Sequence, residues 1–271
     1  MRAMTLGAVL LPWIAQLHAP ICAAAPPGKK QPVSSLKEVT VMLSSAEVDE
    51  VRSALERAAL LPPKQVMPVV FARVRAGLPP MLLDVAIDTL ILLNDPAAGP
   101  LLDDLARHRR SAVRRRALDA AAQLRVRGAE PLLARGLDDL SPEVRSAAVE
   151  GLGEVAARGS FAQVLRALEM GVEGSALSLG KITDSAHLDS ALGLIGEHPL
   201  ETLTPMVETL LMRRDLSEDD KLKVVERLAE VSTEPLRKLL SELLAKLPRE
   251  ASPKLRKAMT DVAESQTKGA S

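Results

Sequence analysis

Apolar residues recur at steps of three and four along most of the chain, which is the spacing that places them on one face of an α-helix. The clearest example lies in residues 141–159, where the stripe consists of Val144, Ala148, Leu152 and Val155. Isolated helices of about 12–15 residues are marginal in water. The stripe therefore predicts a helix whose apolar side is covered by neighbouring helices.

Residues at both ends of this stretch indicate where the helix begins and ends. Ser141 is a good N-cap residue, because its hydroxyl can accept a hydrogen bond from a free backbone N–H. Pro142 follows at the first helical position, where its missing N–H costs nothing. Glu143 stands in the first turn, where the helix dipole favours negative charge. Gly159 is a suitable residue for the helix end.

The same stripe recurs with a period of 31 residues. The copy that begins at Val144 matches copies that begin at Val113 and Leu82, and a fainter match begins at Val51. The segments that follow two of these stripes both begin with Pro-Leu-Leu, so a second helix repeats as well. Two-helix units in series are typical of an α-solenoid. We predict an all-α superhelix of about seven stacked antiparallel helix pairs.

The segment 138–159 resembles the HEAT repeats of the phycobilisome (PBS) lyase type. In that family an acidic residue and a proline precede a Val-Arg pair and a helix rich in small residues. Asp139, Pro142, Val144 and Arg145 occupy these positions here. An earlier copy of the motif keeps the Val-Arg pair but lacks the Asp and the Pro. The resemblance implies a right-handed, HEAT-like stack of helix pairs, and it implies no single activity.

The two ends of the chain differ from the repeats. Residues 1–24 combine Arg2, an apolar run at 5–17 and small residues before a cleavage site near Ala24, which is typical of a signal peptide. The apolar run is too short for a membrane-spanning helix. The expected division is a signal peptide at 1–24, a linker and lead-in at 25–44, the HEAT-like solenoid at 45–266 and a disordered tail at 267–271.

A signal peptide predicts export from a bacterial-type cell, either to the periplasm or into the medium. A lipid anchor at Cys22 is the less favoured alternative, since Pro20 and Ile21 fit a lipoprotein motif poorly. After cleavage the mature chain would contain no cysteine. Packing alone would then stabilise it in an oxidising compartment, and no membrane span would remain.

The composition limits the kinds of site that the chain can form. Hydrophobic residues make up 47% of the chain but aromatic residues only 1%, so the core must be aliphatic and no chromophore cradle is expected. The formal net charge is zero, which predicts no overall attraction to nucleic acid or to a membrane. The scarcity of aromatic side chains for base stacking also argues against nucleic acid.

No motif indicates catalysis or a cofactor. Residues 151–156 fit the loose dinucleotide pattern G-x-G-x-x-G/A, but they lie inside a predicted helix, where small residues allow close packing. The histidines show no metal-ligand spacing, and a surface helix start explains the proximity of Asp184, His187 and Asp189. We therefore predict no enzyme activity, no catalytic or metal residue and no cofactor.

The fifth expected pair, at residues 174–181 and 184–196, is irregular. Gly171, Gly174 and Gly180 lie in it or next to it. Glycine inside a helix costs about 0.5–1 kcal/mol relative to alanine. We therefore expect the solenoid to bend or to be locally weak at this pair.

An arginine cluster is the strongest candidate for a binding site. Residues 107–127 contain eight arginines and one acid, Asp119, which leaves an excess of seven positive charges. Such a patch favours an acidic protein, a phosphate-bearing polymer or an anionic surface. The alternative is that these arginines are solvated or structural. The family resemblance implies that Arg114 and Arg145 belong to an Asp–Arg ladder between repeats.

A second set of charged positions recurs every 31 residues on the second helices: Arg73, Asp104, Arg135 and Arg166. In HEAT-like stacks the second helices line the concave face, and Asp104 could pair with a neighbour. Solvated polar residues on a wet face are the alternative. The predicted partner-binding residues are Arg73, Arg107, Arg109, Arg110, Arg115, Arg116, Arg135 and Arg166.

The sequence thus predicts an exported, non-enzymatic HEAT-repeat scaffold. It would bind a protein partner, with an acidic one favoured, through the concave face and the arginine-rich patch. Two alternatives stay open: a lyase-like or metal-dependent accessory factor, and a structural component of the cell envelope. The sequence identifies neither the partner nor the oligomeric state.

Overall fold

The computed structural model describes residues 35–231 and 234–268. The predicted signal peptide at 1–24 lies outside the described residues. So do the first half of the predicted linker, residues 25–34, and the last three residues of the predicted tail.

Within these residues the chain forms fifteen α-helices and two short 3₁₀ helices. Their bounds are α1 Leu36–Leu43, α2 Val48–Ala58, α3 Pro63–Arg75, α4 Pro80–Leu93, η1 Pro96–Ala98, α5 Gly99–Leu105, α6 Ser111–Gln123, α7 Ala129–Gly136, α8 Pro142–Glu154, η2 Arg158–Ser160, α9 Phe161–Glu169, α10 Ser175–Ile182, α11 Leu188–Gly193, α12 Leu200–Met212, α13 Glu218–Ala229, α14 Glu234–Lys246 and α15 Pro253–Lys268.

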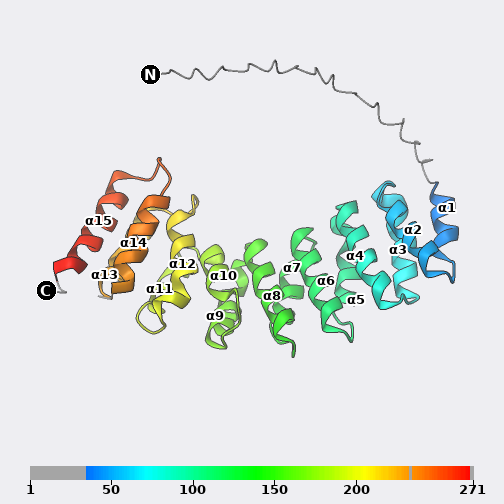
Figure 1. Cartoon of the computed structure of the whole chain (residues 1–271), viewed down its shortest axis with the longest axis horizontal. Helices are drawn as coiled ribbons and strands as arrows, with labels where there is room; N and C mark the ends of the chain where they lie inside the picture. The colour runs from blue at the N-terminus through cyan, green and yellow to red at the C-terminus, as the bar shows by residue number, and fades with distance from the viewer. Residues whose placement is uncertain (1–34, 232–233, 269–271) are drawn as a thin grey trace, which may run out of the picture. The chain divides into compact units, whose positions relative to one another are not determined.

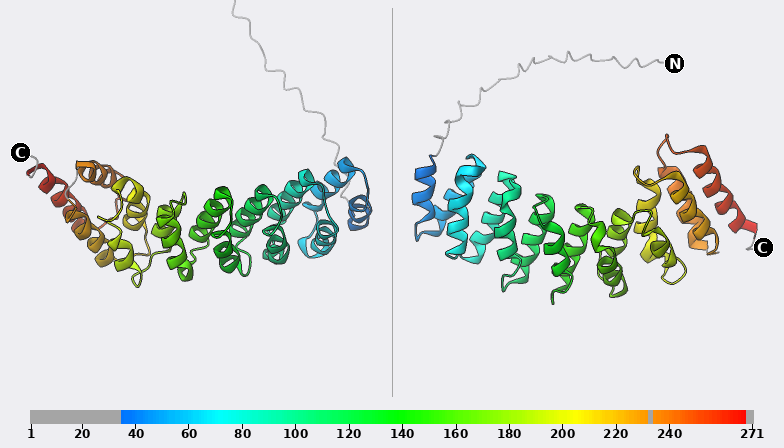
Figure 2. Two further views of the ribbon diagram at one scale, coloured as in Figure 1. Left: turned by 90° about the horizontal axis from the view of Figure 1, so that it is seen from below. Right: turned by 180° about the vertical axis from the view of Figure 1, so that it is seen from behind.

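The helices after α1 form seven consecutive pairs, so the predicted all-α solenoid is confirmed (Figure 1). The first helix of each pair, from α2 to α12, packs against the first helix of the next pair. The contacts of α6 with α8 and of α10 with α12 are the most extensive. The second helices form another row, with the clearest contact between α13 and α15. Two further views show the pairs following one another in chain order (Figure 2).

The lead-in segment is helical where it is described. Helix α1 begins after Ser35, whose side-chain oxygen accepts a hydrogen bond from the Glu38 N–H at 3.2 Å. Val39 and Leu43 are buried, and α1 packs against α2 and α3. At the other end, α15 continues to Lys268, two residues beyond the predicted end of the solenoid.

The core is aliphatic, and the stripe that predicts α8 lies within it. Val144, Ala148 and Leu152 are buried, whereas Val155 is half-buried and follows the helix end. Each buried leucine or valine contributes about 1.5–3 kcal/mol relative to an exposed one. Such stripes from successive pairs form one continuous cluster, which is how a solenoid stabilises helices that are too short to be stable alone.

Helix α8 begins where predicted but ends earlier. Ser141 occupies the N-cap position, yet its hydroxyl donates to Glu143 Oε2 at 2.5 Å and caps no backbone N–H. The helix ends at Glu154, and Ala156 adopts a positive φ of 55° two residues later. The expected end at Gly159 is therefore wrong, because the left-handed turn falls on an alanine.

Glycines inside α8 and α10 allow neighbouring helices to approach closely. A Cβ on Gly153 would lie 2.7 Å from Ser178 Oγ, and one on Gly180 would lie 2.7 Å from Thr209 Cβ. Gly180 therefore belongs to the extensive contact between α10 and α12. The close approach at Gly153 confirms that small residues in α8 allow close packing.

Candidate protein-interaction surface

A bidentate ion pair joins the connecting segments that precede α6 and α8. Arg114 in α6 donates from Nε to Asp139 Oδ2 and from Nη2 to Asp139 Oδ1, both at 2.7 Å. Its Nη1 also donates to the carbonyl oxygens of His108 at 2.8 Å and Arg109 at 3.2 Å. The side chains of Arg114 and Asp139 are only 18% and 14% exposed. One guanidinium thus fixes two loops, one at His108 and Arg109 and the other at Asp139, which is 25 residues beyond Arg114.

The charges in this clamp stabilise each other. The Arg114 hydrogen bonds lower the pKa of Asp139, and the Ser141 backbone N–H, 2.9 Å from Asp139 Oδ1, adds to the effect. The same contact raises the pKa of Arg114. The Asp–Arg ladder that the resemblance implies is confirmed at this step. At the next step Arg145 donates to two carbonyl oxygens but forms no ion pair with a described residue.

The two loops occupy equivalent places in successive repeats. Arg145 Nη1 donates to the carbonyl oxygens of Asp139 and Leu140, just as Arg114 Nη1 donates to those of His108 and Arg109. Leu140 therefore corresponds to Arg109, one repeat further along the stack.

Three exposed side chains on these loops form what we call the loop surface: Arg109, Arg110 and Leu140. The two arginine side chains make no hydrogen bond or ion pair with the described residues, and Leu140 is 95% exposed. The Arg110 backbone N–H donates to His108 Nδ1 at 3.1 Å. Burial and the charges of Arg109 and Arg110 lower the pKa of His108.

Four of the other predicted binding arginines have partners within the chain. Arg107 and Arg135 both pair with Asp103, Arg116 pairs with Asp88, and Arg73 Nη1 donates to the Gly77 carbonyl oxygen at 2.5 Å. Exposed pairs of this kind contribute only about 0–1 kcal/mol each. They nevertheless occupy guanidinium donors that a partner would otherwise use.

The remaining two predicted arginines lie apart from the loop surface. Arg115 lines a groove between α6 and α8 together with Asp119, Glu143 and Glu150. Burial raises the pKa of Asp119 there, although Arg115 opposes the shift. Arg166 is exposed on α9 without a partner among the described residues. Asp104 pairs with Arg75 at 2.9 Å, so the predicted pairing with a neighbour is confirmed.

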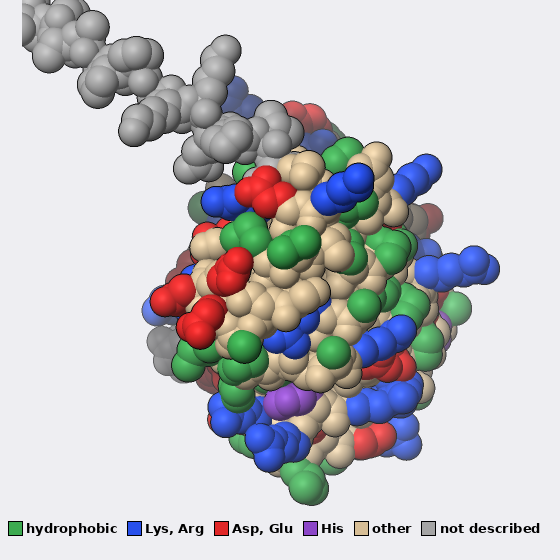
Figure 3. Space-filling view, turned by 90° about the vertical axis from the view of Figure 1, so that its right-hand side faces the viewer, with side chains coloured by type: hydrophobic (Ala, Val, Ile, Leu, Met, Phe, Trp, Pro, Cys, Tyr) green, Lys and Arg blue, Asp and Glu red, His purple; other side chains and the backbone are tan. Residues whose placement is uncertain are grey.

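Positive and negative side chains occupy different parts of the end that carries α1. In Figure 3, Lys and Arg side chains project mainly along the right and lower parts of this end, whereas most Asp and Glu side chains gather towards the left. The net charge of zero therefore conceals a local separation of charge.

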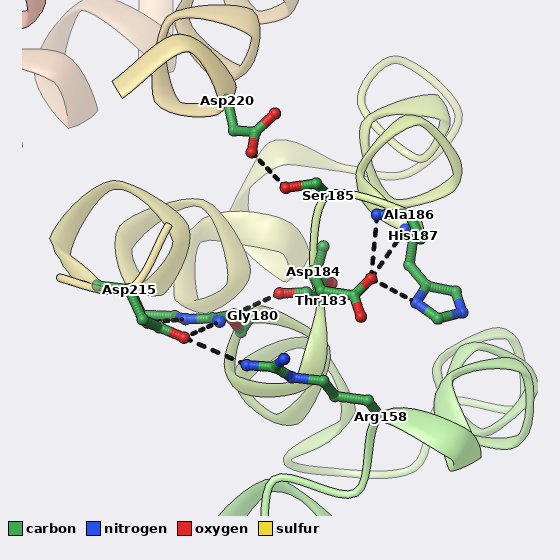
Figure 4. A network of polar contacts seen from close by, with 10 residues as sticks. Arg158, Gly180, Thr183, Asp184, Ser185, Ala186, His187, Asp215 and Asp220 are labelled. Atoms are coloured by element: carbon green, nitrogen blue, oxygen red, sulfur yellow. Dashed lines mark hydrogen bonds and ion pairs between the residues drawn. The ribbon is translucent and has the colours of Figure 1, made fainter. Parts of the chain in front are cut away.

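A second polar cluster surrounds the connection between α10 and α11 (Figure 4). Arg213 donates from Nη1 to the carbonyl oxygens of Gly180 at 2.9 Å and Thr183 at 2.5 Å. Its Nη2 donates to Asp215 Oδ2 at 2.7 Å, and Arg158 Nη2 reaches the same oxygen at 3.4 Å. The Arg213 hydrogen bonds lower the pKa of Asp215 to about 2.

The same cluster contains a histidine beside a carboxylate. Asp184 Oδ1 accepts hydrogen bonds from two backbone N–H groups and lies 2.7 Å from His187 Nδ1. The imidazole stacks on Phe161 with ring centres 4.6 Å apart. Ser185 donates to Asp220 at 2.6 Å and not to His187. A Ser-His-Asp relay needs the serine on the imidazole, so the contacts support a helix start here.

One cavity among the described residues lies near the C-terminal end. It has a volume of about 460 Å³ between the α12–α13 and α14–α15 connections. No group of three or more His, Cys, Asp or Glu side chains in the described part of the chain could hold a metal ion. None of the described helices has both the length and the apolar character that crossing a bilayer requires.

Sequence reasoning missed Leu140 and this cavity. Leu140 lies outside every buried stripe and directly precedes Ser141 and Pro142, a position that already suggests exposure. The cavity gives no such signal, because its leucines belong to ordinary amphipathic stripes.

These features define an α-solenoid of stacked helix pairs. The family model described as HEAT repeats matches residues 98–176, the segment that includes the Arg114 clamp. This part of the chain therefore consists of HEAT repeats, as its sequence predicts. No curated protein matches the chain.

Several solved structures have a similar arrangement of helices. The complex of CpcE and CpcF of phycocyanin lyase from Nostoc sp. PCC7120 is 17% identical, covering 89% of this chain and 97% of that one with a TM-score of 0.45. A designed armadillo repeat protein in complex with the peptide (KR)4 is 21% identical, covering 86% and 99% with a TM-score of 0.27. Another designed armadillo repeat protein, YIII(Dq)4CqI, is 18% identical, covering 86% and 100% with a TM-score of 0.25.

Proposed function

We propose that the chain is a protein-binding scaffold and that the loop surface is its principal contact. The observation that carries this proposal is the contrast among its arginines. Arg114 and Arg116 are engaged within the chain, whereas the side chains of Arg109 and Arg110 form no hydrogen bond or ion pair with a described residue and lie on a loop next to the exposed Leu140. A partner segment with carboxylates beside an apolar side chain would match this surface.

The energetics require several contacts together. Each exposed arginine–carboxylate pair contributes only about 0–1 kcal/mol. Full burial of Leu140 would add about 1.5–3 kcal/mol. The clamp between Arg114 and Asp139 holds both loops before binding, which reduces the ordering that association would otherwise require.

We also propose that the scaffold acts without catalysis and that it is exported. A partner bound to a rigid array needs no reactive group on the array itself. The leader-like composition of residues 1–24 supports export. Cell fractionation, followed by mass spectrometry of the mature N-terminus, tests this point. A mature chain that begins near Ala25 is expected, and an intact Met1 in the cytoplasm would contradict export.

The binding test compares two double variants of equal charge. Arg109→Glu/Arg110→Glu alters the loop surface. Arg125→Glu/Arg127→Glu alters two exposed arginines at the opposite end of α6, about 20 Å away for a helix of this length. Each purified protein is used to capture partners from the cell-envelope and secreted fractions. Captured proteins are then purified, and their affinities are measured at two salt concentrations.

A partner lost by the first variant and kept by the second supports the loop surface as the site. Equal loss with both variants would indicate general charge attraction. Full retention by both, with Leu140→Asp also without effect, would refute the loop surface. A partner whose affinity is insensitive to salt would refute the role of the arginines.

A further inference from the structure

The cavity at the C-terminal end combines an apolar floor with two unpaired cations. Its floor includes Leu211, Leu216 and Leu255, which are buried core residues. The volume of about 460 Å³ lies within the range of roughly 300–1,000 Å³ that is typical of small-molecule sites. The cavity is therefore large enough for an aliphatic chain or for a bulky apolar side chain.

The cations on its wall are Arg214 and Lys221. Neither forms a hydrogen bond or an ion pair with a described residue. Lys221 is half-buried, and burial lowers its pKa, with the nearby Arg213 charge adding to the effect and Asp215 opposing it. A partly desolvated ammonium without a partner favours the approach of an anion.

The carboxylates on the same wall do not neutralise these two cations directly. Glu218 accepts a hydrogen bond from Ser252 Oγ at 2.6 Å, and this contact joins the start of α13 to the loop before α15. Glu250 is exposed on the α14–α15 connection. A ligand that carries a single anionic group could therefore reach Lys221 without displacing an existing ion pair.

We propose that this cavity binds an aliphatic carboxylate, with its apolar part on the leucines and its carboxylate on Lys221. Arg214, at the rim, would make a second contact with the same anion. This chemistry has two sources: a free medium-chain carboxylate, and the C-terminal carboxylate of a peptide that ends in leucine. The site lies on repeats other than those of the loop surface, so its failure and the failure of the proposed function are distinguishable.

The test uses the mature chain and isothermal titration calorimetry at neutral pH. The probes are octanoate, octanol as its uncharged counterpart, and a Gly-Gly-Leu peptide with either a free or an amidated C-terminus. Octanoate is expected to bind more tightly than octanol. Binding of octanoate alone identifies a free carboxylate as the source, whereas binding of only the free-acid peptide identifies a chain terminus.

Two variants locate the site. Lys221→Met keeps the aliphatic stem and removes the charge, so the affinity for the bound carboxylate should fall about tenfold to a hundredfold, the loss expected for one hydrogen bond to a charged group. Lys238→Met, on the exposed surface of α14, is the matched control and should bind like the wild type. Ala251→Trp fills the cavity and should abolish binding with Lys221 intact.

Three results would overturn the proposal. These are no binding of any probe at millimolar concentration, equal affinity for octanoate and octanol, and an unchanged affinity in Lys221→Met. Melting curves establish that each variant is folded. Lys221→Gln provides a second charge-free variant if Lys221→Met does not fold.

Discussion

Gly180 offers a sharp test of how the repeats pack. Helix propensity predicts that replacing it with alanine stabilises the protein, whereas tertiary packing predicts that the same replacement destabilises it. A Cβ at this position would lie 2.7 Å from Thr209 Cβ, 2.9 Å from the Met206 carbonyl oxygen and 3.1 Å from Met206 Cα. Two of these atoms belong to the backbone of α12, which cannot move aside cheaply. The neighbouring helix must therefore shift.

The magnitude follows from two opposing contributions. Alanine gains about 0.5–1 kcal/mol over glycine within a helix. Forcing an extra methyl group into a packed contact costs about 1–3 kcal/mol. We expect Gly180→Ala to lower the free energy of unfolding by about 0.5–2 kcal/mol, which corresponds to a fall in Tm of about 1–8 °C for a chain of this size.

Gly193 is the matched control. It is the last residue of α11, and a Cβ there would meet no atom within 4 Å. Gly193→Ala should therefore stabilise the protein by about 0.4–1 kcal/mol. Calorimetric melting of both variants beside the wild type is the assay. A rise in Tm for both would show that α10 and α12 are not in close contact at Gly180 and would refute the reasoning.

Three further predictions concern the clamp, the acidic pH range and the core. Asp139→Asn leaves the partly buried Arg114 without its anion and should lower the free energy of unfolding in urea by about 1–3 kcal/mol. Asp104→Asn, the control, breaks only an exposed pair and should change this free energy by less than about 1 kcal/mol. Equal effects of the two variants would contradict the clamp. Folding lowers the pKa of Asp139 and Asp215, so the stability that they contribute is complete above the unfolded pKa of about 4 and is lost as the pH falls towards the folded values, about 2 for Asp215. The Tm of the wild type should therefore drop between these pH values. The drop in Tm should be smaller for Asp215→Asn. Leu152→Ala should cost about 2–5 kcal/mol in the same urea assay, because the side chain is fully buried, and an unchanged midpoint would exclude our register for α8.

The helices could be predicted from the sequence because a solenoid repeats a local pattern. Each pair buries stripes spaced at three and four residues, so periodicity alone gives the order of the pairs and most boundaries. Helix ends were harder to predict where the chain used an unusual residue. Ala156 adopts the left-handed conformation that the sequence assigns to Gly159, and no local rule selects the alanine.

The candidate site was only partly predictable, because ion pairing depends on which charges meet in space. Asp103 contacts both Arg107 and Arg135, although 32 residues separate it from the second. Counting charges along the sequence gives an excess of arginines but does not show which of them are engaged. The Arg114 contact with Asp139 could be inferred, because a family motif places an acid and an arginine at a fixed spacing.

The ion pair between Arg158 and Asp215 has a consequence for cooperativity. Arg158 belongs to the fourth pair and Asp215 to the sixth, and their contact passes over the fifth, whose helices have only eight and six residues. In an ideal repeat array each unit interacts only with its immediate neighbours, and unfolding can stop at any boundary. Here a next-nearest-neighbour contact bridges the shortest unit. The two side chains are 52% and 56% exposed, so the contact adds only about 0–1 kcal/mol of direct coupling between the fourth and sixth pairs.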